Sequence, residues 1–425
     1  MTLVAEPQPP TTPAAAAGGR LRLEYLDGLR GLACLYVLLL HAWMLVPWEQ
    51  SSGALAWIGR ATRWVLDGRV AVAVFIVLSG YCLMLPVARA KDGRLRGGMG
   101  PYLKRRSLRI LPPYYAAVAL GVILPFLVPP SFLDRNAGWW WRTMWPVASP
   151  GVLLSHLTLV HNLDNTWFYK INAALWTVAT EWQIYFIFPL VLLPVWRRWG
   201  GLPMLALAVV LGVAPLATGH FELASPWFIG LFASGMAAAS LAFPRTAAGA
   251  AWRDRLPWGT LSAMGFAAFF LEAQFGLLRR MMPTLSDWKF HFLIDNVAGF
   301  AAAGLTIFCT RRLLRPADRH RTPAILRLLE ARWVVGLGLI SYSLYLTHAM
   351  VLVVLELAAG AAHASVAARA GVFLVLGMPL SVAFSYAFYR VFERPFVRRH
   401  MLDVKSAGEQ TTTAGPLVAL PGGPQ

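Results

Sequence analysis

Long apolar runs, separated by short polar segments, occur along almost the whole chain. A helix that crosses a lipid bilayer needs about 20 consecutive, mainly apolar residues, and these runs are close to that length. We therefore predict an all-α fold, a polytopic membrane helix bundle of about ten transmembrane helices. The predicted spans cover residues 26–47, 70–89, 110–128, 173–195, 202–218, 225–243, 257–278, 291–309, 333–356 and 367–390.

The two ends of the chain lack long apolar runs. Residues 1–23 are rich in Pro, Ala and Thr, and residues 403–425 are polar and contain Gly and Pro. Such segments bury too little apolar surface to offset the chain entropy that is lost on folding. We expect disordered tails over 1–23 and 403–425, with one transmembrane domain over 24–402 between them.

The composition favours a membrane protein over a soluble one. Hydrophobic residues make up 57% of the chain and charged residues 14%, whereas a soluble domain carries about 25% charged residues. The formal net charge of +18 would indicate a nucleic-acid partner in a soluble protein. Because the basic residues here mostly flank the predicted spans, we expect a lipid bilayer as partner and no nucleic acid.

The distribution of Lys and Arg predicts the orientation of the chain. When the N-terminus is placed in the cytoplasm, most of the basic residues outside the predicted spans fall in cytoplasmic segments. The positive-inside rule requires this asymmetry. We therefore expect a multi-pass protein of the cell (inner or plasma) membrane, with both termini cytoplasmic.

The cysteines indicate neither a disulfide framework nor a metal site. Cys34, Cys82 and Cys309 all lie in apolar runs and have no CxxC or Cys/His spacing. Buried cysteines of this kind usually pack as small hydrophobic residues. We expect no metal and no tightly bound cofactor.

Several ionisable or polar side chains lie within the predicted spans, where such groups normally face the protein interior and mark function. Arg30 and His41 are eleven residues apart on the first span, close to three helical turns, so they share one face about 16 Å apart. Glu181 and His348 fall at a depth similar to that of His41, and Ser79 lies near the middle of the second span. A packing role is the alternative for each lone histidine and for the small pair Ser79-Gly80.

Two arginines at the cytoplasmic start of the third helix form a candidate anion site. Arg106 and Arg109 are three residues apart and therefore share one helix face. Guanidinium groups bind phosphates through two parallel hydrogen bonds. With Arg30 nearby, these residues are suited to the phosphates of a nucleotide-bearing donor, although ordinary topogenic charge is the simpler alternative.

The segment between the third and fourth spans, residues 129–172, is too long for a simple connection. It is either an aromatic anchor at the membrane interface or a lid that faces the acceptor, since long loops are often functional. Its aromatic and polar residues include Trp139, Trp140, Trp141, Trp145, His156, His161 and Asn162.

Six segments resemble motifs of the membrane-bound acyltransferase 3 family and occur in the same order as in that family. The resemblance extends from Tyr25 to Arg399. The segments are Tyr25-Leu26-Asp27-Gly28-Leu29-Arg30-Gly31 with His41, Phe75 through Gly80, the pair Arg106 and Arg109, Leu175 through Glu181 with Tyr185, Ser341 through His348, and Phe392-Glu393-Arg394-Pro395. The family often has two consecutive acidic residues where this chain has Glu181-Trp182, and commonly Trp-His where it has Thr347-His348.

The resemblance implies an enzyme, an acyl-CoA-dependent O-acyltransferase with a cytoplasmic acyl-CoA donor, commonly acetyl-CoA. It implies transfer of the acyl group to a sugar hydroxyl in a cell-surface glycan or glycolipid. The arginine-ten-residues-histidine motif of the family maps onto Arg30 and His41, and its RxxR motif onto Arg106 and Arg109.

The residue pattern and the resemblance together give an expected mechanism. The residues expected to bind the donor are Arg30, Arg106, Arg109 and Ser79. The expected catalytic residues are His41, Glu181 and His348, with His41 as general base on the acceptor hydroxyl and Glu181 or His348 orienting His41 or the acceptor.

Two other functions fit the same sequence. A glycosylated secondary metabolite, such as a macrolide, is the alternative acceptor. A proton-coupled transporter is the alternative from another class, because interior His and Glu residues also occur in such carriers. Against a transporter, the sequence has no repeat symmetry and the RxxR pair has no evident role in one.

Overall fold

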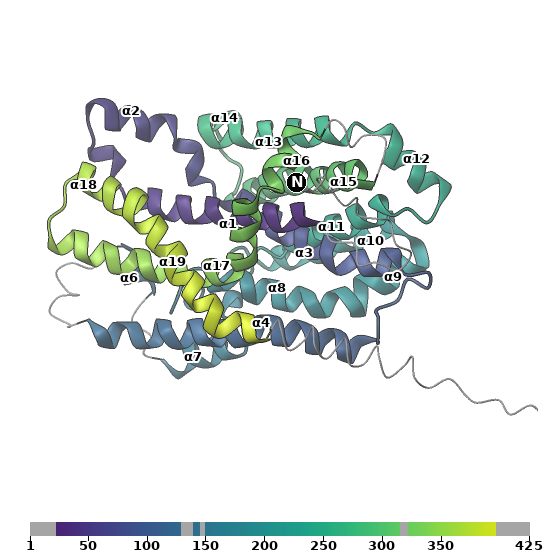
Figure 1. Cartoon of the computed structure of the whole chain (residues 1–425), viewed down its shortest axis with the longest axis horizontal. Coiled ribbons are helices and arrows are strands. Elements are labelled where there is room, and N and C mark those ends of the chain that lie inside the picture. Colours follow the sequence, from purple (N-terminus) through teal and green to yellow (C-terminus); the bar gives the residue numbers. More distant parts are fainter. Residues whose placement is uncertain (1–22, 129–138, 145–148, 315–321, 397–425) are drawn as a thin grey trace, which may run out of the picture.

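The computed structural model describes residues 23–128, 139–144, 149–314 and 322–396, and these residues form helices and connecting turns without a strand. The predicted tail 403–425 lies outside the described residues, as does the tail 1–23 apart from Leu23. The all-α prediction is confirmed. Figure 1 shows the long helices lying side by side.

In the part of the chain that the structure describes, eight helices are long and apolar enough to cross a membrane. They are Glu24–Met44 (α1), Arg69–Arg89 (α3), Met99–Leu127 (α4, Met99–Ile123, and a 3-10 turn), Leu175–Trp199 (α8, Leu175–Ile187, and α9, Leu193–Trp199), Gly201–Thr218 (α10, Gly201–Val213, and a 3-10 turn), Asp287–Leu314 (α15), Arg332–Ala361 (α17) and Val366–Phe396 (α18, Val366–Ala370, and α19, Met378–Phe388). By length and composition, the described chain is thus a multi-pass membrane protein.

The remaining helices are shorter or more polar. They are α2 (Gly53–Ala61), α6 (Trp139–Met144), α7 (Pro150–Leu157), α11 (Phe228–Ala242), α12 (Ala247–Arg255), α13 (Trp258–Phe275), α14 (Leu277–Met281) and α16 (Ala324–Leu329).

The spans predicted at 225–243 and 257–278 are helical, but neither is among the eight. The first is α11, which has 15 residues and bends by 101° into α12, so the count rises to nine if this pair is one span. The second is α13, in which Glu272 and Gln274 make the last turn polar. The predicted ten spans are therefore eight or nine in the described chain. The side on which the termini lie remains a prediction from charge.

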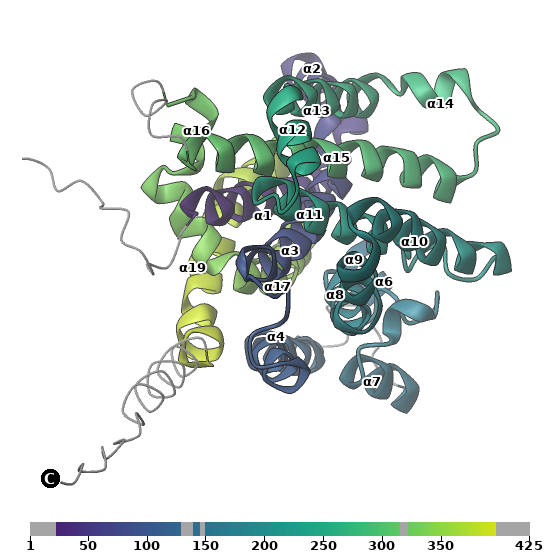
Figure 2. The ribbon, with the colours of Figure 1, turned by 90° about the vertical axis from the view of Figure 1, so that its right-hand side faces the viewer.

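The centre of the bundle consists of two closely packed helix pairs, α1 with α17 and α3 with α11. Figure 2 shows these four helices in the middle, with α13 and α15 on one side and α4 and α7 on the other. Glycines permit the close approach: a Cβ atom at Gly338 would collide with the carbonyl oxygen of Asp27, and one at Gly80 with that of Phe232. Small residues at helix interfaces are typical of membrane proteins.

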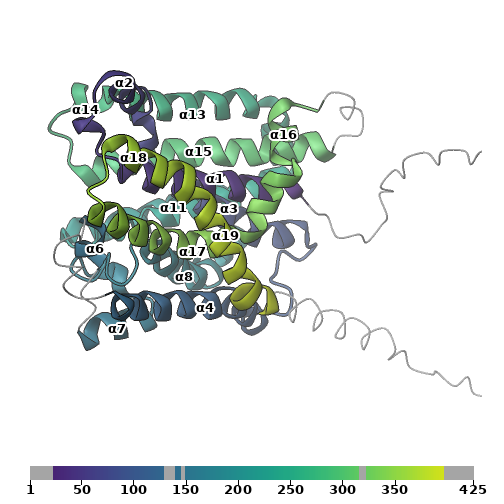
Figure 3. The same ribbon diagram turned by 60° about the vertical axis from the view of Figure 1, so that its left-hand side comes forward.

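Helices α1 and α17 run parallel in a constant register. The Cys34 thiol donates to the carbonyl oxygen of Ser341 (3.2 Å), and His41 contacts His348 (2.8 Å) two turns further along. Both pairs have the same sequence separation of 307 residues. Figure 3 shows α16, which precedes α17, at one end of the bundle and α18, which follows it, at the other. The register of this helix pair therefore fixes which side chains of the two helices meet.

A buried ion pair ties three helices together near the start of α3. Nη2 of Arg69 lies 2.6 Å from Oδ2 of Asp295 on α15, and Nε1 of Trp227, directly before α11, donates to the same oxygen at 2.8 Å. The Asp295 side chain is fully buried. Because removing one partner would leave an uncompensated buried charge, this contact holds α3, α11 and α15 in place.

Candidate active site

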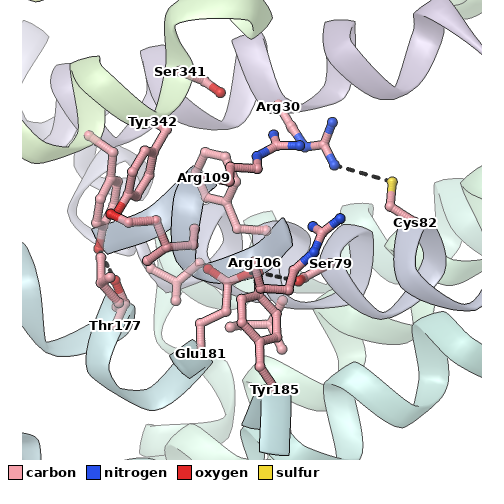
Figure 4. Close-up of a pocket in the computed structure, with 16 residues that line it drawn as sticks. Arg30, Ser79, Cys82, Arg106, Arg109, Thr177, Glu181, Tyr185, Ser341 and Tyr342 are labelled. Carbon is pink, nitrogen blue, oxygen red and sulfur yellow. Dashed lines mark hydrogen bonds between the residues drawn. The ribbon is translucent and has the colours of Figure 1, made fainter. Parts of the chain in front are cut away.

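A cavity of about 310 Å³ opens between α1, α3, α4, α8 and α17. Figure 4 shows the side chains that line it. The polar and charged members are Arg30, Ser79, Cys82, Arg106, Arg109, Thr177, Glu181, Tyr185, Ser341, Tyr342 and Tyr345. Aliphatic and aromatic side chains of the same helices complete the wall, so the cavity has a polar part inside an apolar bundle.

Three guanidinium groups, those of Arg30, Arg106 and Arg109, converge in this cavity (Figure 4), which we call the arginine cavity. Arg30 comes from α1, and Arg106 and Arg109 come from one face of α4, as their spacing predicts. Arg30 donates to Oδ1 of Asp27 (3.1 Å) and to the sulfur of Cys82 (3.2 Å). Within the described chain, Nε of Arg106 is buried without a hydrogen-bond partner. The arginines repel one another, so the cavity is suited to an anion.

The single carboxylate among the described lining residues belongs to Glu181. The Tyr185 hydroxyl donates its proton to Oε1 of Glu181 at 2.5 Å. The Ser79 hydroxyl lies 3.1 Å from the Tyr185 oxygen and donates to it, because the tyrosine proton is already used. This chain joins α3 to α8, and it orients Ser79 and Glu181 along one wall of the cavity.

The two histidines predicted from the sequence meet directly. Nδ1 of His41 lies 2.8 Å from Nε2 of His348, and their ring planes are 13° apart. Nδ1 of His348 lies 2.9 Å from the carbonyl oxygen of Leu344. A carbonyl oxygen can only accept, so this nitrogen of His348 carries the proton. Its Nε2 then accepts from Nδ1 of His41, and the lone pair of the His41 ring is on Nε2.

The structure separates the predicted catalytic residues into two neighbouring groups. Glu181 lies among the arginines, whereas neither His41 nor His348 is among the described residues that line the cavity. Tyr345 connects the groups: it lines the cavity, and its ring centroid lies 6.0 Å from that of His348. The prediction that Glu181 and the histidines converge thus applies to the two histidines, and Glu181 lies on the side of the arginines.

Three tyrosines of the site were not predicted from the sequence as site residues. Tyr185 bonds Glu181, Tyr342 donates to the carbonyl oxygen of Ile110 at 3.0 Å, and Tyr345 shares a 2.6 Å hydrogen bond with Thr177. Tyr345 precedes His348 by three residues, so helical spacing alone could have placed it beside the histidine. Tyr185 follows Glu181 by four residues and carries the same signal.

Three polar residues of the segment 149–172, His156, His161 and Asn162, are buried inside the protein. The imidazole rings of His156 and His161 stack with centroids 3.9 Å apart, and both are fully buried. Nδ1 and Nε2 of His156 lie within hydrogen-bond distance of the carbonyl oxygens of Val152 and Lys170, and Asn162 donates to Thr180 at 3.0 Å. These contacts give His156, His161 and Asn162 a structural role. Trp145 lies outside the described residues, as do 129–138.

The chain resembles known proteins in two comparisons. The profile of the acyltransferase 3 family, described as an acyltransferase domain, matches residues 23–390. A curated relative, the peptidoglycan O-acetyltransferase OatA of Listeria monocytogenes serovar 1/2a, is 26% identical over 197 residues. That match covers 45% of this chain and 27% of the relative, so the chain spans about a quarter of that protein's length. No solved structure matches the chain.

The family match extends over all the elements that build the site. It begins at the residue before α1 and ends within the last long helix, so it includes the arginine cavity and the histidine pair. The resemblance inferred from the six short segments is therefore confirmed at the level of the family. The chain belongs to the acyltransferase 3 family, whose profile is described as an acyltransferase domain.

Proposed function

We propose that the protein transfers an acyl group, such as acetyl, from acyl-CoA to a sugar hydroxyl in a cell-surface glycan or glycolipid. One observation carries the proposal: a cavity with three arginines adjoins, through Tyr345, a histidine pair whose hydrogen bonds define its tautomer. The arginines provide an anion site for the donor. The histidines provide a base for the acceptor.

The arginine cavity fits the phosphates of coenzyme A. Guanidinium groups bind phosphate oxygens through paired, charge-assisted hydrogen bonds. The Nε of Arg106, which has no hydrogen-bond partner among the described residues, supplies a donor for this purpose. His41 is eleven positions after Arg30 on α1, which corresponds to about 16 Å along the axis. The pantetheine arm of coenzyme A has a comparable length, so a thioester can reach the histidines while the phosphates remain on the arginines.

The tautomer of the histidine pair supports a general-base role for His41. Its Nε2 carries the lone pair and takes the proton of the acceptor hydroxyl as the hydroxyl oxygen attacks the thioester carbonyl carbon. The new C–O ester bond forms and the C–S bond breaks. The proton on His41 then passes to the departing thiolate, which leaves as the thiol of coenzyme A. Nε2 of His348 accepts a hydrogen bond from Nδ1–H of His41 and thereby holds the His41 ring in place.

Glu181, Tyr185 and Ser79 have a positioning role in this mechanism. The carboxylate of Glu181 offsets part of the positive charge of the arginines, and Tyr185 fixes the direction in which the carboxylate points. Ser79, bonded to the Tyr185 oxygen, supplies a polar contact on the same wall for the donor. These side chains shape the donor cavity and do not exchange protons with the acceptor.

The acceptor is proposed from the comparison with known proteins. The relative from Listeria monocytogenes is named a peptidoglycan O-acetyltransferase, and its match covers less than half of this chain. A glycan hydroxyl is therefore the acceptor class that the similarity favours. The arginines support an anionic donor such as acyl-CoA, independently of that similarity.

Radiolabelled acetyl-CoA tests the proposed function. Membranes from the source cells are incubated with it, with and without the protein, and alkali-labile acetyl esters on non-CoA products are counted. We expect ester formation that depends on the protein. Equal label in the two membrane preparations would contradict acyl transfer, and acetyl-CoA binding without ester formation would favour a transporter or binding protein.

A further inference from the structure

A second polar cavity, of about 940 Å³, lies where α1 and α17 end, and we call it the end cavity. Its walls are the last residue of α1, the segment that follows it, the last two turns of α17 and the start of α18. Figure 3 shows α18 at the end of the bundle opposite α16. The charged and polar residues that line this cavity are Glu49, Gln50, Glu356, His363, Ser365 and Arg369.

The histidine pair separates this end cavity from the arginine cavity along both helices. On α1, Arg30 lines the arginine cavity, His41 follows, and Met44 lines the end cavity three residues later. On α17, Tyr345 lines the arginine cavity, His348 follows, and Glu356 lines the end cavity. Glu356 is eight residues, or about 12 Å, beyond His348. Because α1 and α17 are parallel, the arginine cavity, the histidine pair and the end cavity follow one another in the same order along both helices.

The Glu356 carboxylate is a hydrogen-bond acceptor in the end cavity that requires a donor from a ligand. Its side chain is 7% exposed, and within the described chain its Oε2 is buried without a hydrogen-bond partner. A buried, unpaired carboxylate oxygen is costly unless a donor reaches it. Arg369 lines the same cavity, but its Nε donates to the carbonyl oxygen of Ala364 at 3.3 Å. A ligand that supplies hydroxyl groups would satisfy Glu356.

The charge of the end cavity differs from that of the arginine cavity. Among the described residues that line it, two carboxylates, those of Glu49 and Glu356, accompany one guanidinium group, that of Arg369. Two carboxylates disfavour a phosphorylated or otherwise anionic ligand. They favour an uncharged group with several hydroxyls, such as a sugar ring.

We propose that this end cavity is the acceptor subsite and that it binds an uncharged, hydroxyl-bearing sugar unit through Glu356. The inference rests on the proposed function and adds the location and charge class of the acceptor. The donor reaches the histidine pair from the arginine side and the acceptor from the opposite side. The hydroxyl to be acylated then points toward His41, while other hydroxyls of the ring donate to Glu356.

Two substitutions test the subsite in the full-length protein in membranes. Glu356→Gln keeps the side-chain shape and removes the charge, and Met44→Trp fills part of the cavity from an exposed position. Val354→Trp, on an exposed position of α17 outside the cavity lining, is the matched control. Ester formation from radiolabelled acetyl-CoA is measured beside the Kd of acetyl-CoA for the detergent-purified protein.

We expect Glu356→Gln to lower ester formation roughly 10-fold or more, which corresponds to the loss of about one charge-assisted hydrogen bond. Met44→Trp should lower it by a similar factor because the indole ring occupies the space of the ligand. The Kd of both variants for acetyl-CoA should stay within about 2-fold of wild type, and Val354→Trp should behave as wild type. Ester formation near the wild-type rate in both cavity variants would overturn the subsite and leave the proposed function standing. No protein-dependent ester formation by wild type would overturn both.

The ester product tests the ligand class. Mass spectrometry of the acylated molecule gives the charge of the unit that carries the ester. An uncharged sugar unit supports the assignment. A phosphorylated unit would overturn it, because two carboxylates would then face the phosphate.

Discussion

Nδ1 of His41 lies 2.8 Å from Nε2 of His348, and this contact joins two helices whose paired residues are 307 positions apart in the sequence. The bond from His348 to the carbonyl oxygen of Leu344 sets the direction of both protons. As a result, one histidine is oriented and the other is left with its basic nitrogen on Nε2. The geometry assigns different roles to two residues of the same type.

His348 acts through His41, so the two variants of His348 should differ. His348→Leu removes the acceptor of the His41 Nδ1 proton and should lower kcat about 10²-fold, the cost of misplacing a reacting group by ~1 Å. His348→Gln should recover part of the rate, because its amide oxygen can accept the same proton. Steady-state kinetics with acetyl-CoA checks this. Equal loss in the two variants would indicate a role for His348 other than orienting His41.

The arginine cavity should control the affinity for the donor. Arg106→Ala or Arg109→Ala removes a charge-assisted contact to phosphate and should raise the Kd of acetyl-CoA about 10- to 100-fold. Arg→Lys should restore only part of the affinity because the paired hydrogen bonds are lost. Lys104→Ala, at an exposed position of the same helix, is the control for general loss of charge. An unchanged Kd in both arginine variants would indicate that these residues only set the orientation of the helix in the membrane and do not bind the donor.

The packing of α1 on α17 should be sensitive to a single methyl group. A Cβ atom at Gly338 would collide with the carbonyl oxygen of Asp27, whereas one at Gly336 would have no heavy atom within 4 Å among the described residues. Gly338→Ala should therefore destabilise the protein by about 1–3 kcal/mol and lower transfer by shifting His41 against His348. Gly336→Ala should have neither effect. Thermal unfolding in detergent and the ester assay check this; equal behaviour of the two variants would contradict the close approach.

Stability should depend on pH through Asp67, which precedes α3. Burial, together with the neighbouring carboxylate of Asp295, raises the pKa of Asp67 to about 6, above the value near 3.9 of an unfolded chain. The folded state therefore binds the proton more tightly than the unfolded chain. The resulting stabilisation of the fold, about 3 kcal/mol, is fully present below pH ~4 and is lost as the pH rises through about 6. Asp67→Asn should flatten that part of the stability profile. Identical wild-type and Asp67→Asn profiles from pH 4 to 7 would contradict it.

The sequence predicted the helices and most side chains of the site, because both depend on local spacing. Apolar runs gave the long helices, and helical periodicity placed Arg106 and Arg109 on one face. The end of α11 agrees with the predicted end of the span at residue 243, next to Pro244, which cannot continue the helix. Helix α12 and its bend of 101° against α11 were not predicted.

The partners of the side chains could not be predicted, because depth along a helix does not determine the direction in which a residue points. Glu181 was expected near the histidines by depth, yet it faces the arginines from α8. The contact between His41 and His348 depends on the register of α1 and α17. That register is set by glycine contacts such as Gly338 with Asp27, between residues more than 300 positions apart.

We propose His41 as the base for acyl transfer, and the substitution His41→Gln tests this role. His41→Gln keeps a hydrogen-bonding side chain at this position but cannot take a proton at neutral pH. Membranes with matched amounts of each protein are assayed for ester formation, and the purified proteins for acetyl-CoA binding. We predict a rate about 10²–10⁴-fold below wild type with unchanged Kd for acetyl-CoA. A His41→Gln protein that keeps most of its transfer rate would contradict the account.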